Sequence, residues 1–146
     1  MPSLKSHIHK NMVLLLLSLT MFLVVLDSAI VNVALPAIKS HLNFDQASLQ
    51  WVLTAYILTF GGFLMLGGRA ADLFGRRKVL LWGIGGFTLF SLLIGLSHTS
   101  LMLIILRALQ GLAAAFMAPT ALSILLTTFA EGPERNKALS IWGLVA

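Results

Sequence analysis

Long apolar runs separated by short polar breaks dominate the chain. Four of them are long enough to cross a bilayer, because a spanning helix needs roughly 20 apolar residues. They cover about residues 12–37, 49–71, 79–97 and 101–127. A fifth run begins near residue 138 and reaches the last residue without a polar flank, so we expect an N-terminal piece of a longer protein. The pattern predicts an all-α, polytopic membrane helix bundle.

The polar breaks predict the helix ends. Gly75 and the pair Gly132-Pro133 indicate turns, and Pro36 is expected where the first helix stops at its outer end. Residues 1–11 are predicted to form a cytoplasmic N-terminal tail, and residues 12–146 a partial transmembrane half.

The composition excludes most soluble functions. Hydrophobic residues make up 58% of the chain and charged residues 10%, whereas a globular domain has about 45–50% and about 25%. The absence of cysteine excludes disulfides, thiolate metal sites and a catalytic thiol. The four histidines lie at tails and helix ends without the spacing of metal ligands or of a catalytic triad. We therefore expect no enzyme and no catalytic, cofactor-binding or metal-binding residues.

The net charge of +5 is distributed unevenly over the breaks. Alternate breaks and the N-terminus carry eight of the ten cations, which are Lys5, Lys10, Arg69, Arg76, Arg77, Lys78, Arg135 and Lys137. The opposite side carries only Lys39. Because cytoplasmic loops are enriched in Lys and Arg, the N-terminus is predicted to be cytoplasmic. The charge thus indicates topology and not a nucleic-acid partner.

Two charged residues lie inside predicted spans. An ionisable group there costs about 2.5–3.5 kcal/mol on insertion scales and by default indicates a functional site. Counting from the outer helix ends, Asp27 lies about 15 Å deep and Arg107 about 9 Å. Burial disfavours a charged carboxylate whereas a nearby cation favours it, so Asp27 could take up and release a proton beside Arg107. A purely structural ion pair is the alternative.

Small residues share the helix face of Arg107. Gly111 and Ala115 lie four residues apart on this face, next to Gln110. In membranes such spacing favours close helix packing. The glycine-rich second and third spans indicate close contacts or hinges, since no strand precedes them as a phosphate-binding loop would require.

Three segments resemble motifs of the major facilitator superfamily. Residues 68–80, GRAADLFGRRKVL, are similar to the loop motif G-x-L-a-D-r-x-G-r-k-x-x-l and depart from it at two positions. Residues 103–115, LIILRALQGLAAA, resemble the fourth-helix motif l-x-x-x-R-x-x-q-G-x-g-a-A. Residues 26–36, LDSAIVNVALP, resemble the first-helix motif of the fourteen-span drug:proton antiporter branch. The three motifs occur in the order of the family, on the first span, between the second and third spans, and on the fourth span.

The resemblance implies roles for particular residues. Asp27 and Arg107 would carry proton coupling or meet a cationic substrate, and the fourth-helix motif adds Gln110 and Gly111. A cytoplasmic latch would comprise Gly68, Asp72, Gly75, Arg76 and Arg77. In it, the glycine would allow close approach of the opposite half, the acid would face a helix N-terminus, and Arg76 would pair with Glu131 or Glu134.

The resemblance also implies a function for the parent protein. It would be a proton-coupled multidrug efflux transporter of the cell membrane, working by alternating access with the proton as coupling ion and no cofactor. Its expected partners are membrane lipid, an amphipathic or cationic small molecule, and the remaining helices of the transporter. A symporter, a metabolite exporter and a non-transporting receptor or assembly protein are the alternatives. Four spans cannot form two six-helix halves, so we expect residues 1–146 alone not to transport.

Overall fold

A computed structural model describes residues 4–42 and 44–145, with side chains from residue 9 onward. The chain forms five helices, α1 (Leu4–His41), α2 (Gln46–Phe74), α3 (Arg76–Gly95), α4 (Ser100–Thr128) and α5 (Pro133–Val145). The first four are long and apolar enough to cross a membrane, whereas α5 has 13 residues. The predicted all-α membrane bundle is confirmed.

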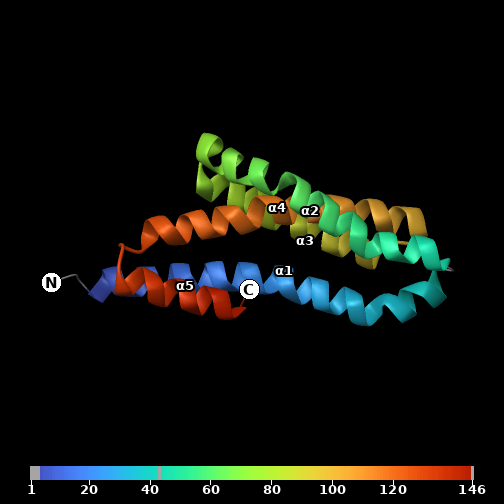
Figure 1. The fold of residues 1–146 in the computed structure, drawn as a ribbon, viewed down its shortest axis with the longest axis horizontal. Helices are drawn as coiled ribbons and strands as arrows, with labels where there is room; N and C mark the ends of the chain where they lie inside the picture. Colours follow the sequence, from blue (N-terminus) through green and yellow to red (C-terminus); the bar gives the residue numbers. More distant parts are fainter. Residues whose placement is uncertain (1–3, 43, 146) are drawn as a thin grey trace.

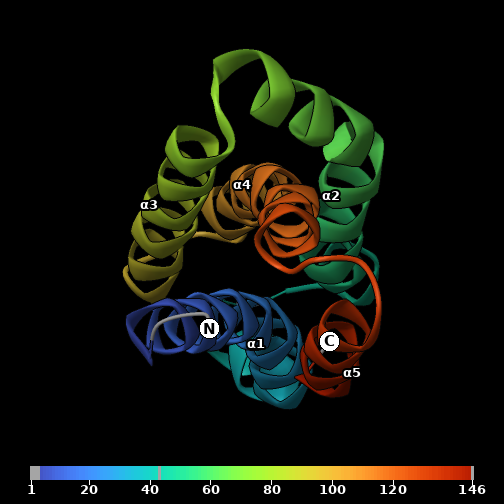
Figure 2. The same ribbon diagram turned by 90° about the vertical axis from the view of Figure 1, so that its left-hand side faces the viewer.

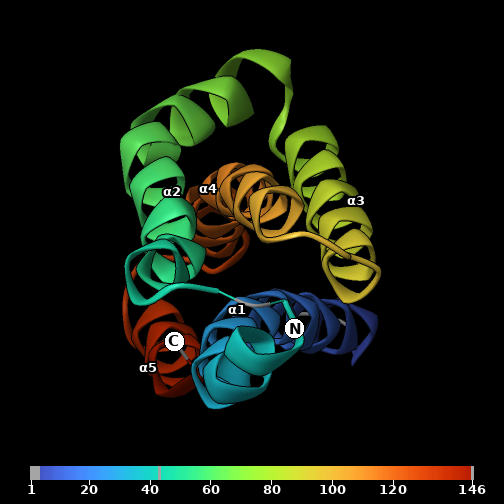
Figure 3. The same ribbon diagram turned by 90° about the vertical axis from the view of Figure 1, so that its right-hand side faces the viewer.

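The helices run along one long axis, with α4 between α2 and α3 (Figures 1 and 2). Helix α1 packs across this group, and α5 lies beside α1, as the opposite view also shows (Figure 3). The N-terminal end of α1, the α2–α3 turn and the α4–α5 turn share one end of the bundle (Figure 1). These are the segments that carry the cation-rich breaks. Lys5, one of the eight predicted cytoplasmic cations, has its side chain outside the described set.

Local chemistry explains most helix boundaries. The Thr99 hydroxyl accepts a hydrogen bond from the Met102 backbone N–H at 3.2 Å and so caps α4. Gly75 and Gly132 have φ angles of 94° and 114°, which favour glycine, and they form the turns before α3 and α5. Pro133 then opens α5, where its missing N–H is not needed.

Helix α1 extends beyond the predicted span at both ends. It begins at Leu4, so most of the predicted tail is helical. The expectation that the helix stops at Pro36 is wrong, since α1 continues to His41. Proline removes one backbone hydrogen bond, but ending a helix in lipid would expose several unsatisfied groups.

The α2–α4 contact depends on glycine. A Cβ atom on Gly67 would overlap the backbone carbonyl of Ala115, and one on Gly111 would overlap the Tyr56 carbonyl and the Thr59 hydroxyl. The Thr59 hydroxyl also donates a hydrogen bond to the carbonyl of Ala108 across the interface, at 2.7 Å. The close packing predicted at Gly111 and Ala115 is confirmed.

We expect Gly67→Ala to destabilise the α2–α4 pair because the added methyl group would meet a backbone carbonyl that cannot rotate away. Overpacking of this kind costs about 1–3 kcal/mol. Gly62→Ala is the matched control, since a Cβ atom there meets no described atom within 4 Å. Thermal unfolding in detergent should show a lower melting temperature only for the first variant. Equal melting temperatures would show that the helices separate readily at Gly67.

Candidate functional site

The two charged residues predicted inside the spans are in direct contact. Arg107 Nη1 of α4 donates to Asp27 Oδ2 of α1 at 2.6 Å. The Arg107 side chain is 1% exposed and that of Asp27 17%. The acid is therefore the member of the pair that retains access to the surroundings of the bundle.

Gln110 joins the same cluster. Its side-chain oxygen accepts from Arg107 Nη1 at 2.6 Å, and its Nε2 donates to Asp27 Oδ1 at 2.8 Å. The same nitrogen donates to the Ser91 hydroxyl of α3 at 2.6 Å. Both carboxylate oxygens of Asp27 thus have a partner, and the cluster connects α1, α3 and α4.

Helix α2 holds the other side of the guanidinium. Arg107 Nε donates to the backbone carbonyl of Val52 at 3.1 Å. The guanidinium carbon lies 4.3 Å from the ring centroid of Tyr56, which is a cation–π distance. Ser91, Val52 and Tyr56 were not predicted as members of the site from the sequence. A polar tip in the middle of an apolar span, as in Tyr56 and Ser91, is the signal that could have identified the two side chains.

The carboxylate side of the Asp27–Arg107 ion pair is fully hydrogen-bonded. A buried ion pair is stable only when its remaining donors and acceptors are satisfied, as they are here for the carboxylate. Protonation of Asp27 would remove the negative charge facing Arg107 and weaken the direct bond between α1 and α4. The arrangement therefore places a carboxylate at the contact between α1 and α4. Its role in transport stays a prediction.

The loop motif lies at the end of the bundle that contains the α2–α3 turn. Gly75 forms the turn, and Asp72 and Arg76 are 3.6 Å apart across it, both partly exposed. Arg77 is exposed. A Cβ atom on Gly68 would make only an ordinary contact of 3.7 Å with Pro119. Within this chain Gly67, and not Gly68, makes the close helix contact. The latch role of the loop motif stays a prediction.

The pairing expected between Arg76 and a cytoplasmic acid differs in the structure. Glu131 pairs with Arg135 in the next turn at 3.1 Å, and Glu134 pairs with Lys10 of α1 at 2.8 Å. Each acid thus has a cation closer than Arg76. The second pair connects the start of α1 with the start of α5.

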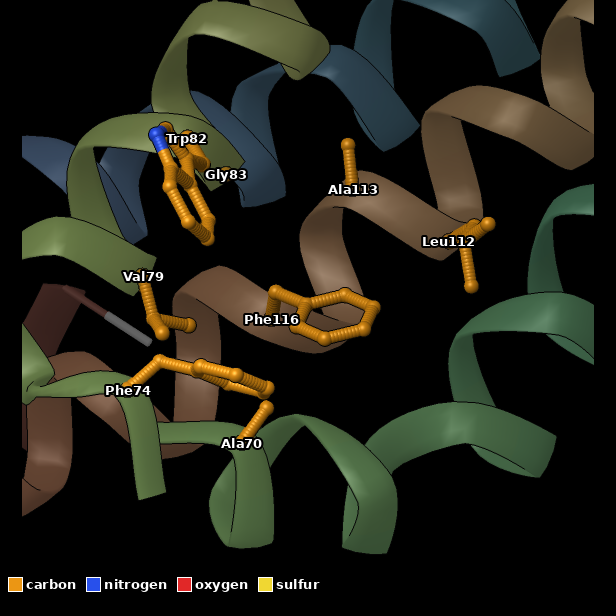
Figure 4. A pocket seen from close by; sticks show the side chains of 8 residues that line it. All are labelled: Ala70, Phe74, Val79, Trp82, Gly83, Leu112, Ala113 and Phe116. Atoms are coloured by element: carbon orange, nitrogen blue, oxygen red, sulfur yellow. The ribbon is translucent and has the colours of Figure 1, made fainter. Parts of the chain in front are cut away.

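An apolar cavity of about 290 Å³ lies elsewhere, between α2, α3 and α4. The rings of Phe74 and Phe116 lie across it, with Val79 and Trp82 from α3 on the opposite wall (Figure 4). None of the Asp27 cluster lines it. Nor do the described residues contain three His, Asp or Glu side chains grouped as a metal site.

Comparison with known proteins finds relatives that are drug exporters or resistance proteins by name. The chain is 50% identical over 125 residues to a cephamycin export protein of Amycolatopsis lactamdurans, covering 86% of this chain and 26% of that protein. It is 51% identical over 124 residues to a puromycin resistance protein of Streptomyces alboniger, covering 85% and 25%. A multidrug resistance protein of Mycobacterium tuberculosis is 39% identical over 128 residues, covering 88% and 24%.

The chain spans about a quarter of the length of these relatives. A family model described as Major Facilitator Superfamily matches residues 17–146. The match includes all three motif segments, most of the first candidate span and the whole of the other three. It confirms the resemblance and the prediction that the chain is not an enzyme. The chain is a multi-pass membrane protein that belongs to the Major Facilitator Superfamily.

Proposed function

We propose that the protein formed by this chain and the remaining transporter helices is a proton-coupled exporter of amphipathic, cationic compounds. It belongs in this proposal to the fourteen-span drug:proton antiporter branch. The printed names of its relatives, which include cephamycin export and puromycin resistance, support export of small molecules. The observation that carries the proposal is the buried cluster of Asp27, Arg107 and Gln110.

The cluster suggests how a proton and a substrate compete. With Asp27 ionised, its carboxylate attracts both Arg107 and a cationic substrate. Proton uptake from the outside neutralises Asp27, which releases the substrate outward and weakens the α1–α4 bond. Proton loss to the cytoplasm restores the anion and resets the cycle. The proton is the coupling ion, and no cofactor is needed.

The distribution of charge supports an orientation in the cell membrane. The described cations of the breaks, apart from Lys39, lie at the end of the bundle that contains the N-terminal end of α1 (Figure 1). The positive-inside rule makes that end cytoplasmic. In this orientation the loop motif, from Gly68 to Arg77, faces the cytoplasm. A latch that closes against the opposite half of the transporter would need this position.

Everted membrane vesicles containing the whole transporter test the proposed function. With an acidified lumen, an exporter should accumulate a fluorescent amphipathic cation while protons leave, so the lumen becomes more alkaline after substrate is added. A symporter would instead move substrate and protons together out of the vesicle lumen. Accumulation that persists after nigericin collapses the pH gradient would contradict proton coupling.

A further inference from the structure

Tyr56 forms an aromatic platform beneath Arg107. Its ring centroid lies 4.3 Å from the guanidinium carbon, and the residue is 5% exposed. The ring is held in place from the side, because Phe60 stacks on it with a centroid distance of 6.0 Å and an interplanar angle of 9°. The cation thus rests on a ring that has little freedom to move.

The platform and the Val52 carbonyl act from one helix. Val52 and Tyr56 are four residues apart, so α2 presents both groups to the guanidinium from the same face. Gly111 allows this approach, since a side chain there would overlap the Tyr56 carbonyl. Helix α2 therefore holds Arg107 through contacts that do not depend on the charge of Asp27.

We propose that Tyr56 is a positioning residue that stabilises the Arg107 cation during the part of the cycle in which Asp27 is protonated. This inference rests on the proposed proton coupling. A guanidinium that is 1% exposed cannot be solvated by water when its carboxylate partner becomes neutral. The face of the Tyr56 ring carries partial negative charge and remains in contact with it. The Tyr56 ring therefore contributes most to stabilising the Arg107 cation when Asp27 carries no charge.

The charged groups around the cluster are few. Asp27 comes from α1 and Arg107 from α4, whereas α3 contributes only the uncharged Ser91. Tyr56 is the titratable group that α2 contributes. Its buried hydroxyl faces the Ser28 side chain of α1 and makes no described hydrogen bond to Asp27, Arg107 or Gln110, so the ring face is the part that acts on Arg107.

Three variants of the whole transporter distinguish the effect of the Tyr56 ring from the effects of its hydroxyl and of another aromatic ring on α2. Tyr56→Leu removes the platform, Tyr56→Phe keeps the ring without its hydroxyl, and Phe63→Leu removes an exposed ring two turns further along α2. The measurement is the rate of proton-driven export of a fluorescent cation in everted vesicles as a function of luminal pH. The amount of inserted protein is measured alongside.

We expect Tyr56→Leu to shift the pH of half-maximal export to lower values by roughly one unit, equivalent to about 1.4 kcal/mol. The direction follows because loss of the ring disfavours the state with a protonated Asp27, so a higher proton concentration is needed to reach it. Tyr56→Phe should keep the wild-type profile, as should Phe63→Leu. If the Leu variant does not insert, Tyr56→Met makes the same test with a flexible apolar side chain.

Two results would overturn the inference. One is an unshifted profile for the variant without the ring, and the other is an equal shift for Phe63→Leu, which would reduce the effect of Tyr56 to packing. Both results overturn the inference when the export by the wild-type protein depends on the pH gradient. A wild type whose export does not depend on it would contradict the proposed function itself.

Discussion

Replacing Asp27 by asparagine is expected to abolish proton-driven export while leaving the helix bundle folded. Asparagine has nearly the same shape, and its single side-chain oxygen can still accept from Arg107, although its NH2 group then faces the Gln110 nitrogen. It cannot bind and release a proton in the physiological range. In everted vesicles with an acidified lumen, addition of substrate should then cause no loss of luminal protons.

Asp45→Asn is the matched control for this experiment. Asp45 is an exposed acid at the start of α2 and makes no described contact with the cluster, although hydrogen bonds from Ser48 lower its pKa. It should retain export and proton release at wild-type levels. Loss of both activities in both variants would show that coupling does not reside specifically at Asp27.

Replacing Arg107 by alanine should have the second largest effect, on stability as well as transport. The change removes the bonds to Asp27, Gln110 and the Val52 carbonyl, and it leaves a carboxylate in the bundle without its cation. Breaking a buried pair by removing one partner costs about 3–5 kcal/mol. Thermal unfolding in detergent should show a clear fall in melting temperature, together with loss of export.

Lysine at position 107 gives an intermediate case. It keeps the positive charge but lacks the planar fork that reaches Asp27, Gln110 and the α2 carbonyl at once. Its melting temperature should fall between those of the wild type and the alanine variant. Arg77→Ala, at an exposed position, should leave the melting temperature unchanged. A wild-type melting temperature for Arg107→Ala would show that the cluster does not hold the helices together.

The span order could be predicted because hydropathy directly reflects the solvent that surrounds each helix. The helix ends could not be placed as well, since they depend on single residues. Gly75 alone separates α2 from α3, whereas Pro36 does not end α1. Continuation through a proline depends on the cost of exposed backbone in lipid, and a rule taken from soluble helices underestimates that cost.

The contact between Asp27 and Arg107 could be inferred from similar depths, and Gln110 from its place on the same helix face. Depth and face do not determine how neighbouring helices are rotated toward one another. Val52 and Tyr56 were therefore missed, because which side of α2 faces α4 is decided by packing at Gly111.

The same limit explains the misplaced contacts of the loop region. Adjacent helix residues point about 100° apart, so the close α2–α4 contact involves Gly67 although the family motif drew attention to Gly68. The acids near α5 were available by sequence, but Lys10 and Arg135 lie closer to them than Arg76. Distances between separate helices require the folded structure.

In the proposed cycle, Asp27 exchanges a proton for a substrate. The most direct measurement is proton release by the purified transporter in weakly buffered detergent solution when an amphipathic cation is added. At a pH where Asp27 is protonated, the wild type should release protons in proportion to the substrate bound, and Asp27→Asn should bind substrate without releasing any. Equal proton release from both proteins would contradict the account.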